Sequence, residues 1–292
     1  MPMLTRRSAL TSIVSGLLIN TDVRSAERVA GPPLWVAEHG PARVYFLGQM
    51  PVRADSVWLS SAVQQAFDGS TELWTENPEP APGPPPAPPV SAGPKLSEVV
   101  TPQEMSRLRA LLVREGLAAN ALDSTLLADS YPAVSWLQDH AMGVDYTLIP
   151  ERVLRTKAKA AKKSVHSEWA SIQDAMGFES GLPKDVRRQF DLELFRRGLD
   201  EAENLSEGNR RLAEWQVGSL AALDAMDQRN RRLYPILDKL IGADRNMAWT
   251  ARTASIMART KSAFVCVGIG HLLGPASIQR YLLKSGVTVR RV

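Results

Sequence analysis

The stretch AFVCVGIGHLLGP, residues 263–275, lies near the C-terminus and decides the expected fold. Its five leading apolar residues end at Gly268, a pattern typical of a short buried strand followed by a tight turn. Gly268 and Gly270 carry no Cβ, so we expect the backbone there to bend and to approach a ligand closely. His271 would then lie just past the carboxyl end of the strand, where open α/β sheets bind their ligands.

A second stretch, RVYFLGQMP at residues 43–51, has the same outline. Each stretch has a strand, a glycine, two further residues and then a marked position, which is His271 in the late copy and Pro51 in the early one. Proline has no ligand atom and cannot act as a base. Its neighbours do not replace a histidine, because the Gln49 amide is a poor ligand and Arg53 is cationic.

The composition allows a sizeable core and argues against a nucleic-acid partner. The chain has 292 residues, of which 44% are hydrophobic. Thirty-five basic and 31 acidic residues give a formal charge of +4, and residues 1–25 supply three arginines and one aspartate of these, a net +2. The remainder carries only +2 and shows no basic patch with interleaved aromatic residues. The single cysteine, Cys266, lies in the apolar strand and is expected to be an inert core thiol.

The N-terminus predicts export. An arginine pair at 6–7 precedes an apolar run at 9–19, which indicates a signal peptide over 1–25 with a cut after Ser25. Residues 5–10 also loosely fit a twin-arginine signal. We therefore expect a periplasmic or secreted protein, with an uncleaved N-terminal anchor as the alternative. The apolar run is too short to indicate a membrane span, and no later segment comes closer to one.

The chain from 26 to 292 is expected to form a single domain. Residues 34–37 and 43–47 predict a hairpin, and a helix over 54–68 and a strand over 71–76 follow. The segment 78–94 is almost entirely Pro, Ala, Gly and Ser, which predicts an extended surface insertion. A domain boundary there is the alternative, but the part before it is too small to be a domain.

The middle of the chain is strongly helical. Thr101-Pro102-Gln103-Glu104 is a helix start with a Thr cap, Pro at the first helical position and Glu three residues after the cap. Further helices are expected at 118–128, 132–141 and 149–161, and a strand is expected at 164–168. Helices follow over 183–259, with breaks near Gly208 and Gly242 and with Asp244 as the cap of the last one. A helix ending at Gly286 and a strand over 287–290 complete the chain. The basic run 155–163 is expected to be a solvated helix face, with contact to acidic lipid headgroups as the alternative.

Two other site types do not fit the motifs. A dinucleotide fingerprint needs a third glycine where the chain has Leu273, and an acidic residue further on that is absent. The four histidines, at 39, 140, 166 and 271, are too few and too scattered for a histidine-rich metal cage. Any metal site would have to be rich in carboxylates.

Several motifs together resemble the TraB/GumN family, which includes TraB-, PrgY- and Tiki-type proteins. The match is strongest at 264–275, the late Gly-x-x-His motif. Asp244-Arg245-Asn246 is similar to the family's Arg-Asn pair, and Glu76 lies where the family has a strand-end glutamate. Glu168 falls where the family often has a Leu-Glu-Thr sequence, although only the glutamate matches.

The resemblance implies an α/β fold related to erythromycin-esterase and ChaN-like proteins. This fold has a central mixed sheet built from two related halves, each with a strand-Gly-x-x-His unit, and a helix-rich middle insertion. The implied chemistry is metal-assisted or histidine-based hydrolysis of a peptide or ester bond. The residues implied as catalytic are His271, Glu76 and Arg245, and His271 and Glu76 would also hold a divalent metal such as Mn, Co or Zn. The residues implied to line a pocket for a peptide or small polar ligand are Gly48, Glu168, Asn246, Gly268 and Gly270.

Pro51 departs from the family pattern at the decisive position. The sequence therefore predicts a divergent member with a degraded hydrolase site and a retained ligand pocket. An active hydrolase is the alternative, and an interaction protein that uses the proline-rich segment is a third class without a positive motif. Each charged candidate also has an ordinary explanation. Glu76 and Glu168 would be surface carboxylates, and Arg245 would pair with Asp244 or another nearby acid at a helix start.

Overall fold

The computed structural model describes residues 31–78 and 93–292. The expected signal peptide at 1–25, its cut after Ser25 and nearly all of the proline-rich insertion at 78–94 lie outside these ranges.

The described strands form one mixed sheet in the order β4-β3-β5-β2-β1-β6. The strands are β1 (Leu34–His39), β2 (Ala42–Gln49), β3 (Glu72–Thr75), β4 (Ser164–Ser167), β5 (Ser262–Gly268) and β6 (Thr288–Arg291). Neighbours from β4 to β2 run parallel, whereas β1 is antiparallel to both β2 and β6. The predicted hairpin is β1–β2, and the expected α/β class with a mixed sheet is confirmed.

The two glycine-containing strands, expected in two related halves, are adjacent at the centre of this sheet. Their register places Gly48 beside Val267 and Gln49 beside Gly268. Residues 263–267 of β5 are fully buried. A strand covered on both faces needs a continuous apolar run rather than an alternating one, which explains the sequence of this stretch.

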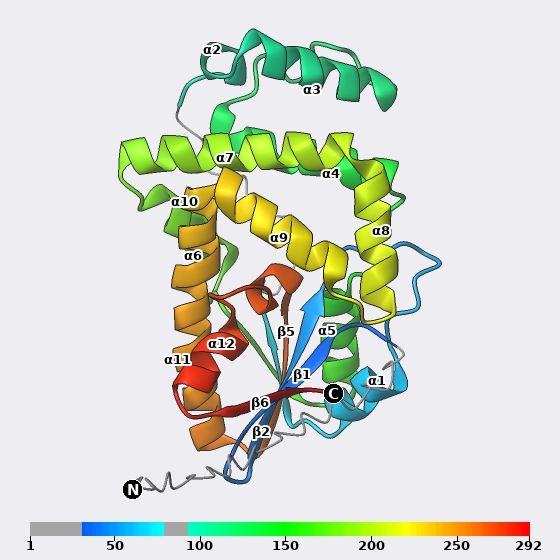
Figure 1. The fold of residues 1–292 in the computed structure, drawn as a ribbon, viewed down its shortest axis with the longest axis vertical. Helices are drawn as coiled ribbons and strands as arrows, with labels where there is room; N and C mark the ends of the chain where they lie inside the picture. Colours follow the sequence, from blue (N-terminus) through cyan, green and yellow to red (C-terminus); the bar gives the residue numbers. More distant parts are fainter. Residues whose placement is uncertain (1–30, 79–92) are drawn as a thin grey trace, which may run out of the picture.

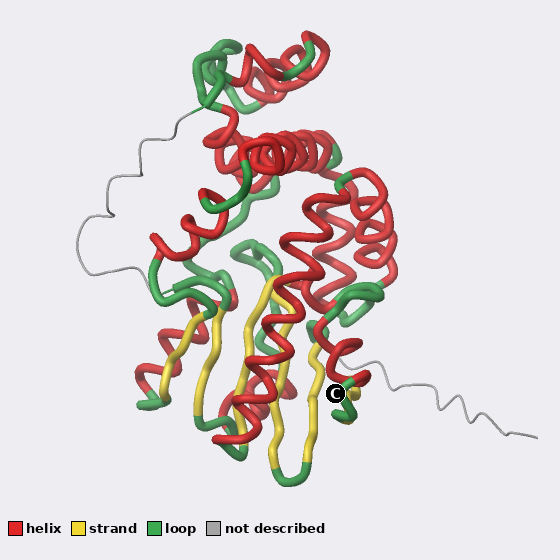
Figure 2. Tube along the Cα trace, turned by 90° about the vertical axis from the view of Figure 1, so that its left-hand side faces the viewer, coloured by secondary structure: helices red, strands yellow, loops and turns green. Residues whose placement is uncertain are grey.

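Helices cover both faces of the sheet and the edge at which its parallel strands end. The helices are α1 (Ser61–Asp68), α2 (Leu96–Val99), α3 (Pro102–Arg114), α4 (Leu127–Ala141), α5 (Pro150–Ala160), α6 (Ile172–Ser180), α7 (Lys184–Glu203), α8 (Leu205–Gln216), α9 (Ala221–Leu233), α10 (Pro235–Leu237), α11 (Arg245–Arg259) and α12 (Ile278–Lys284). Figure 1 shows α11 and α12 on one side of the sheet and α1 and α5 on the other. Helices α4 and α7 to α9 lie beyond the carboxyl ends of the parallel strands, as Figures 1 and 2 show.

The start of α3 agrees with its sequence signal. Thr101 Oγ1 accepts a hydrogen bond from Glu104 N (3.1 Å), and Glu104 Oε2 accepts one from Thr101 N (2.7 Å). This reciprocal capping box, with Pro102 at the first helical position, satisfies two backbone donors that have no partner inside the helix.

Two expected helices differ in the structure. The helix predicted over 54–68 begins only at Ser61, where Ser60 Oγ caps Val63 N (3.3 Å). Val57, which fitted the helical spacing, is 80% exposed, so the apolar spacing before Ser60 does not mark a buried face. The helix predicted at 118–128 is wrong, because this segment forms consecutive turns and α4 starts at Leu127.

Neither glycine at which a helix break was expected ends a helix, although α7 and α8 are separated at Asn204, just before Gly208. Gly208 lies inside α8, where a Cβ would be 2.9 Å from Met142 Sδ, so this glycine permits a close helix contact. Gly242 lies in a π-helical segment, Asp238–Asp244, that leads directly into α11. Asp244 is therefore helical and caps nothing, and its carboxylate pairs with Lys239 Nζ (2.6 Å).

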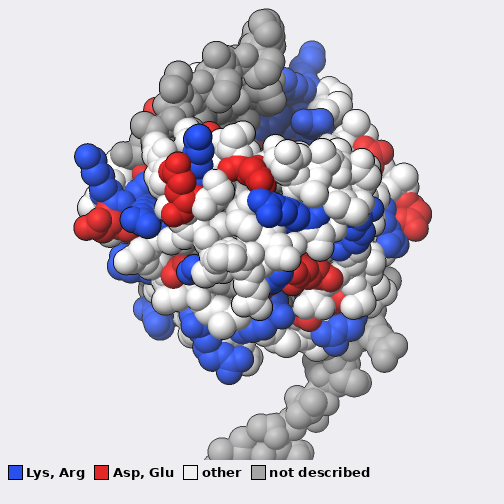
Figure 3. Space-filling model, turned by 90° about the horizontal axis from the view of Figure 1, so that it is seen from above, with Lys and Arg blue, Asp and Glu red and all other residues white. Residues whose placement is uncertain are grey.

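The outer surface carries charges of both signs. In the view of Figure 3, Lys and Arg side chains are interspersed with Asp and Glu side chains over the face formed by the helices. In the described part of the chain, no helix is both long enough and apolar enough to cross a membrane.

Candidate ligand site at the carboxyl ends of the parallel strands

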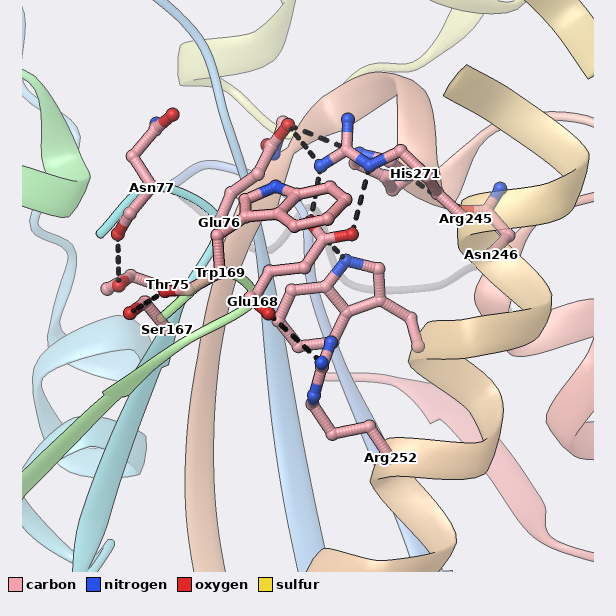
Figure 4. Close-up of polar contacts among 12 residues, drawn as sticks. Thr75, Glu76, Asn77, Ser167, Glu168, Trp169, Arg245, Asn246, Arg252 and His271 are labelled. Atoms are coloured by element: carbon pink, nitrogen blue, oxygen red, sulfur yellow. Dashed lines mark hydrogen bonds and ion pairs between the residues drawn. The ribbon is translucent and has the colours of Figure 1, made fainter. Parts of the chain in front are cut away.

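The fold brings the sequence-predicted site residues to one edge of the sheet. Gly48 lies at the end of β2, while Glu76, Glu168 and His271 follow the ends of β3, β4 and β5. Carboxyl ends of neighbouring parallel strands meet at the same edge, so residues far apart in the sequence become neighbours there. Arg245 opens α11 and reaches the same place, as Figure 4 shows.

Arg245 joins the two glutamates. Its Nη2 donates to Glu76 Oε1 at 2.9 Å, and its Nε donates to Glu168 Oε1 at 3.0 Å. A further ion pair joins Nη2 to Glu168 Oε2, which also accepts from Trp249 Nε1 at 3.1 Å. The Arg245 guanidinium lies 6.0 Å from the centre of the Trp169 ring. Glu168 is therefore not a surface carboxylate, because its side chain is only 4% exposed, and the acids that Arg245 pairs with are Glu76 and Glu168 and not Asp244.

His271 is held in one orientation. It is 5% exposed, and its Nδ1 lies 2.6 Å from Asn246 Oδ1. Asn246 Nδ2 donates to the Ala276 carbonyl (2.8 Å), which fixes the amide with its oxygen toward the ring. Since that oxygen only accepts, Nδ1 carries the proton of the hydrogen bond. The other nitrogen, Nε2, is then directed to Glu76 Oε1, 3.4 Å away.

Glu76 is ionised by its surroundings. Burial by itself raises its pKa, but the charges of His271 and Arg245 and hydrogen bonds from His271 and Gly268 N hold the pKa well below its ordinary value of 4.5. The Gly268 N–H donates to Glu76 Oε2 at 2.9 Å. Burial alone lowers the pKa of Arg245, but Glu168 and Glu76 raise it above its ordinary range. The edge of the sheet therefore carries a fixed carboxylate beside an oriented imidazole.

Replacing Glu76 with glutamine should change how stability depends on pH. Because the native pKa lies below 4.5, ionised Glu76 stabilises the fold above that pH, and this stabilisation is lost as the pH falls below it. We expect the difference in unfolding free energy between wild type and Glu76→Gln to shrink by about 1 kcal/mol or more from pH 7 to pH 3. Urea unfolding at several pH values measures it. The same change at exposed Asp185, Asp185→Asn, is the control, and equal pH profiles for all three proteins would contradict the assignment.

The glycines at the strand ends have different roles. A Cβ on Gly48 would lie 2.3 Å from Ile269 Cδ1 and 3.2 Å from its Cα, so the two glycine motifs pack directly on each other. The Gly48 carbonyl also accepts from buried Trp215 Nε1 (2.7 Å). A Cβ on Gly268 would lie 3.2 Å from Glu76 Oε2. Gly270 has no protein atom within 4 Å of such a Cβ and lines the cavity described below.

Alanine at Gly48 should therefore be costly, and alanine at Gly270 should not. We expect Gly48→Ala to lower the free energy of unfolding by about 1–3 kcal/mol, because the backbone of Ile269 must move. Gly270→Ala is the matched control and should change it by less than about 0.5 kcal/mol. Equal effects in chemical denaturation would show that the contact between the motifs is not close.

The site opens into a cavity of about 460 Å³. Glu76, Asn246 and His271 line its end at the sheet, together with Gly268 and Gly270. The early motif contributes lining residues at 49–51, so Pro51 faces the same space as His271. Three residues expected at the ligand, Gly48, Glu168 and Arg245, do not line it. They lie behind the wall and position the residues that do.

A buried network beside the site was not predicted from the sequence. Gln49 Nε2 donates to Glu151 Oε2, and Glu151 N donates to Gln49 Oε1, both at 3.0 Å. Arg155 donates to Thr75 Oγ1 (2.7 Å) and to Glu151 Oε1 (3.1 Å), and it also reaches the Asn77 carbonyl (2.7 Å). Burial, together with the charge of Glu76, raises the pKa of Glu151 despite hydrogen bonds from Gln49 and Asn77.

This network corrects the expectation for 155–163. Arg155 is buried, because α5 turns Glu151, Leu154, Arg155 and Ala158 toward the sheet at helical spacing. Only the later part of the run can form a solvated face. A glutamate after a proline at a helix start is an ordinary start signal, so nothing in the sequence distinguished Glu151 as a buried residue.

The residues present do not fit a divalent metal. Glu76 and His271 supply two donors, and the position that would add a third from the early motif is Pro51. Within 31–78 and 93–292, no three or more His, Cys, Asp and Glu side chains are arranged to hold a metal ion. Cys266 is fully buried, and burial raises its pKa well above the ordinary value, in agreement with an inert core thiol.

The model of the TraB/PrgY/gumN family matches residues 33–291. The chain belongs to this family. The match runs from just before β1 to the last residue of β6, so it covers the whole sheet and the helices beyond the carboxyl ends of its parallel strands. A search of curated proteins and a search of solved structures found no match.

Proposed function

We propose that this TraB/PrgY/gumN protein is a divergent member that binds a peptide or small polar ligand without two-histidine hydrolysis. The observation that carries the proposal is the cavity of about 460 Å³, with Glu76 and His271 on its wall and Pro51 at the position of the early histidine. Its volume lies in the range of small-molecule sites. The strand-end wall offers a carboxylate and an imidazole that can hydrogen-bond an amide or hydroxyl group.

The second candidate is a single-histidine hydrolase. The observation that favours it is the chain of hydrogen bonds from Ala276 through Asn246 to His271, which leaves Nε2 beside the cavity. In its neutral form, with the proton on Nδ1 and Nε2 unprotonated, a histidine oriented in this way can act as a general base toward a water molecule. Glu76, 3.4 Å from Nε2, would stabilise the imidazolium that forms.

Turnover by the purified chain separates these candidates. The substrates are a panel of fluorogenic peptides and p-nitrophenyl esters, with or without added Mn²⁺, Co²⁺ or Zn²⁺. We expect no hydrolysis that depends on His271, so wild type and His271→Ala should behave alike. His39→Ala removes an exposed histidine of the β1–β2 turn and is the matched control. Hydrolysis that is lost in His271→Ala and retained in His39→Ala would overturn the proposal in favour of the hydrolase.

We also propose that the protein acts outside the cytoplasm, after removal of residues 1–25. The support is the arginine pair followed by an apolar run and small residues. Cell fractionation with N-terminal sequencing tests this, and an intact N-terminus in the cytoplasm would contradict it.

A further inference from the structure

The helices at the end of the cavity away from the sheet line it with charges of both signs, namely three arginines and the carboxylates of Asp139, Glu201, Asp227 and Asp238. Arg197 of α7, Arg211 of α8 and Arg231 of α9 all face the space that Glu76 and His271 face from the sheet. The cavity thus has two chemically different ends.

Two of these arginines have partners. Arg231 forms an ion pair with Asp227, one turn earlier on α9. Arg197 Nη2 donates to Tyr131 Oη (2.8 Å), and its Nε lies 3.9 Å from Glu201 Oε1. Each of these guanidinium groups has an ion-pair partner, although Arg197 Nε makes no hydrogen bond in the described part of the chain.

Arg211 is different. It is only 5% exposed, and within the described residues no carboxylate lies within 4.0 Å of its guanidinium. Its one hydrogen-bond partner in those residues is the sulfur of Met226, which Nη1 contacts, and a thioether is a weak acceptor. Its Nε is buried without any partner. Buried charges in folded proteins are normally paired, so an acceptor for this cation is missing.

Charged groups of both signs surround Arg211. Burial lowers its pKa most, Glu201 and Glu207 raise it in part, and the like charges of Arg229 and Arg197 lower it by less. Arg229 Nε is also buried without a partner in the described part of the chain. The nearby carboxylates therefore do not offset the cost of burying the Arg211 charge.

We infer that the Arg211 end of the cavity binds an anionic group of the ligand, a carboxylate or a phosphate. The inference rests on the proposed function, because it assumes that the cavity holds a ligand. An anion there would supply the missing acceptor, and the planar guanidinium can donate two parallel hydrogen bonds to either group. The ligand would then span the cavity, with its anionic group at Arg211 and a polar group at Glu76 and His271.

Anion titration of the mature chain tests this. Inorganic phosphate and glutarate serve as probes, at constant ionic strength balanced with NaCl, and the melting temperature and calorimetric affinity are measured. Arg211→Met removes the buried cation, and Arg210→Met removes the exposed neighbour on the same helix as a matched control. We expect at least one probe to stabilise wild type and Arg210→Met, and Arg211→Met to bind it about tenfold more weakly or worse.

The anion-free proteins give a second readout. Arg211→Met should then melt at the same temperature as wild type or higher, because a buried cation without a partner is removed. Arg211→Lys keeps the charge and should retain part of the binding. Binding of phosphate alone identifies a phosphate-bearing ligand, and binding of glutarate alone identifies a carboxylate.

Three results would overturn the inference. These are equal affinities in wild type and Arg211→Met, no stabilisation of wild type by either probe, and a melting temperature of anion-free Arg211→Met below those of wild type and Arg210→Met. The outcomes are distinct from those for the proposed function. Turnover that depends on His271, found together with anion binding that depends on Arg211, would refute the proposed function and leave the anion site standing.

Discussion

Replacing Arg245 with methionine should lower the free energy of unfolding by about 3–5 kcal/mol, the cost of removing one partner from a buried ion pair. The guanidinium is the cation that contacts both Glu76 and Glu168. Glu168 is 4% exposed and Glu76 is 20% exposed, so water cannot replace the lost charge well. Glu168 would have to be protonated or remain buried without a cation, and Glu76 would keep only His271 as an ion-pair partner among the described residues.

Urea unfolding at pH 7 measures this effect. Arg280→Met, an exposed arginine on α12, is the control and should change stability by less than about 0.5 kcal/mol. Adding Glu168→Gln to Arg245→Met should recover part of the loss, because one uncompensated charge is removed. A loss below about 1 kcal/mol in Arg245→Met would mean that the cluster behaves like a solvated surface pair.

Replacing Pro51 with histidine should create a metal site. Pro51 and His271 line the same cavity, and Glu76 lies 3.4 Å from His271, so a second imidazole would give the strand ends a third donor. Loss of a group that only hydrogen-bonds to a metal ligand already lowers metal affinity by about 10–100-fold. We therefore expect Zn²⁺ to bind Pro51→His more tightly than wild type by at least that factor.

Calorimetry with Zn²⁺ and the visible spectrum with Co²⁺ measure this gain. Pro51→Ala removes the proline without adding a donor and should leave affinity at the wild-type level. Adding His271→Ala to Pro51→His should abolish the gain. Unchanged affinity in a folded Pro51→His protein would show that the two glycine motifs do not correspond as their sequences indicate.

His271 could be predicted from a local sequence signal, because a buried strand shows itself as an apolar run and the residues after it lie at the edge of the sheet. The strands before Glu76 and Glu168 are not such runs, so these two residues were selected through the family resemblance. The sequence did not show which of these side chains face the cavity, because that depends on their contacts with residues of α11. Arg245 lies behind Glu76 for this reason.

The residues that sequence patterns missed depend on contacts between distant segments. Glu151 is buried beside Gln49, about a hundred positions earlier, whose side-chain amide hydrogen-bonds to both the backbone N–H and the carboxylate of Glu151. Arg211 resembles its neighbour Arg210 in the sequence, and only the packing of α8 against α9 buries one and exposes the other. Gly208 lies inside a helix for a similar reason, because a close contact with Met142 requires it.

The most direct test of the central claim concerns the metal content of the purified wild-type chain. The protein is incubated with Mn²⁺, Co²⁺ or Zn²⁺, passed through a desalting column and analysed for bound metal. With Pro51 at the early motif, we predict far less than one tightly bound ion per chain and no difference between wild type and His271→Ala. One tightly bound ion per chain, lost in His271→Ala, would contradict the account and identify the strand-end site as a metal centre.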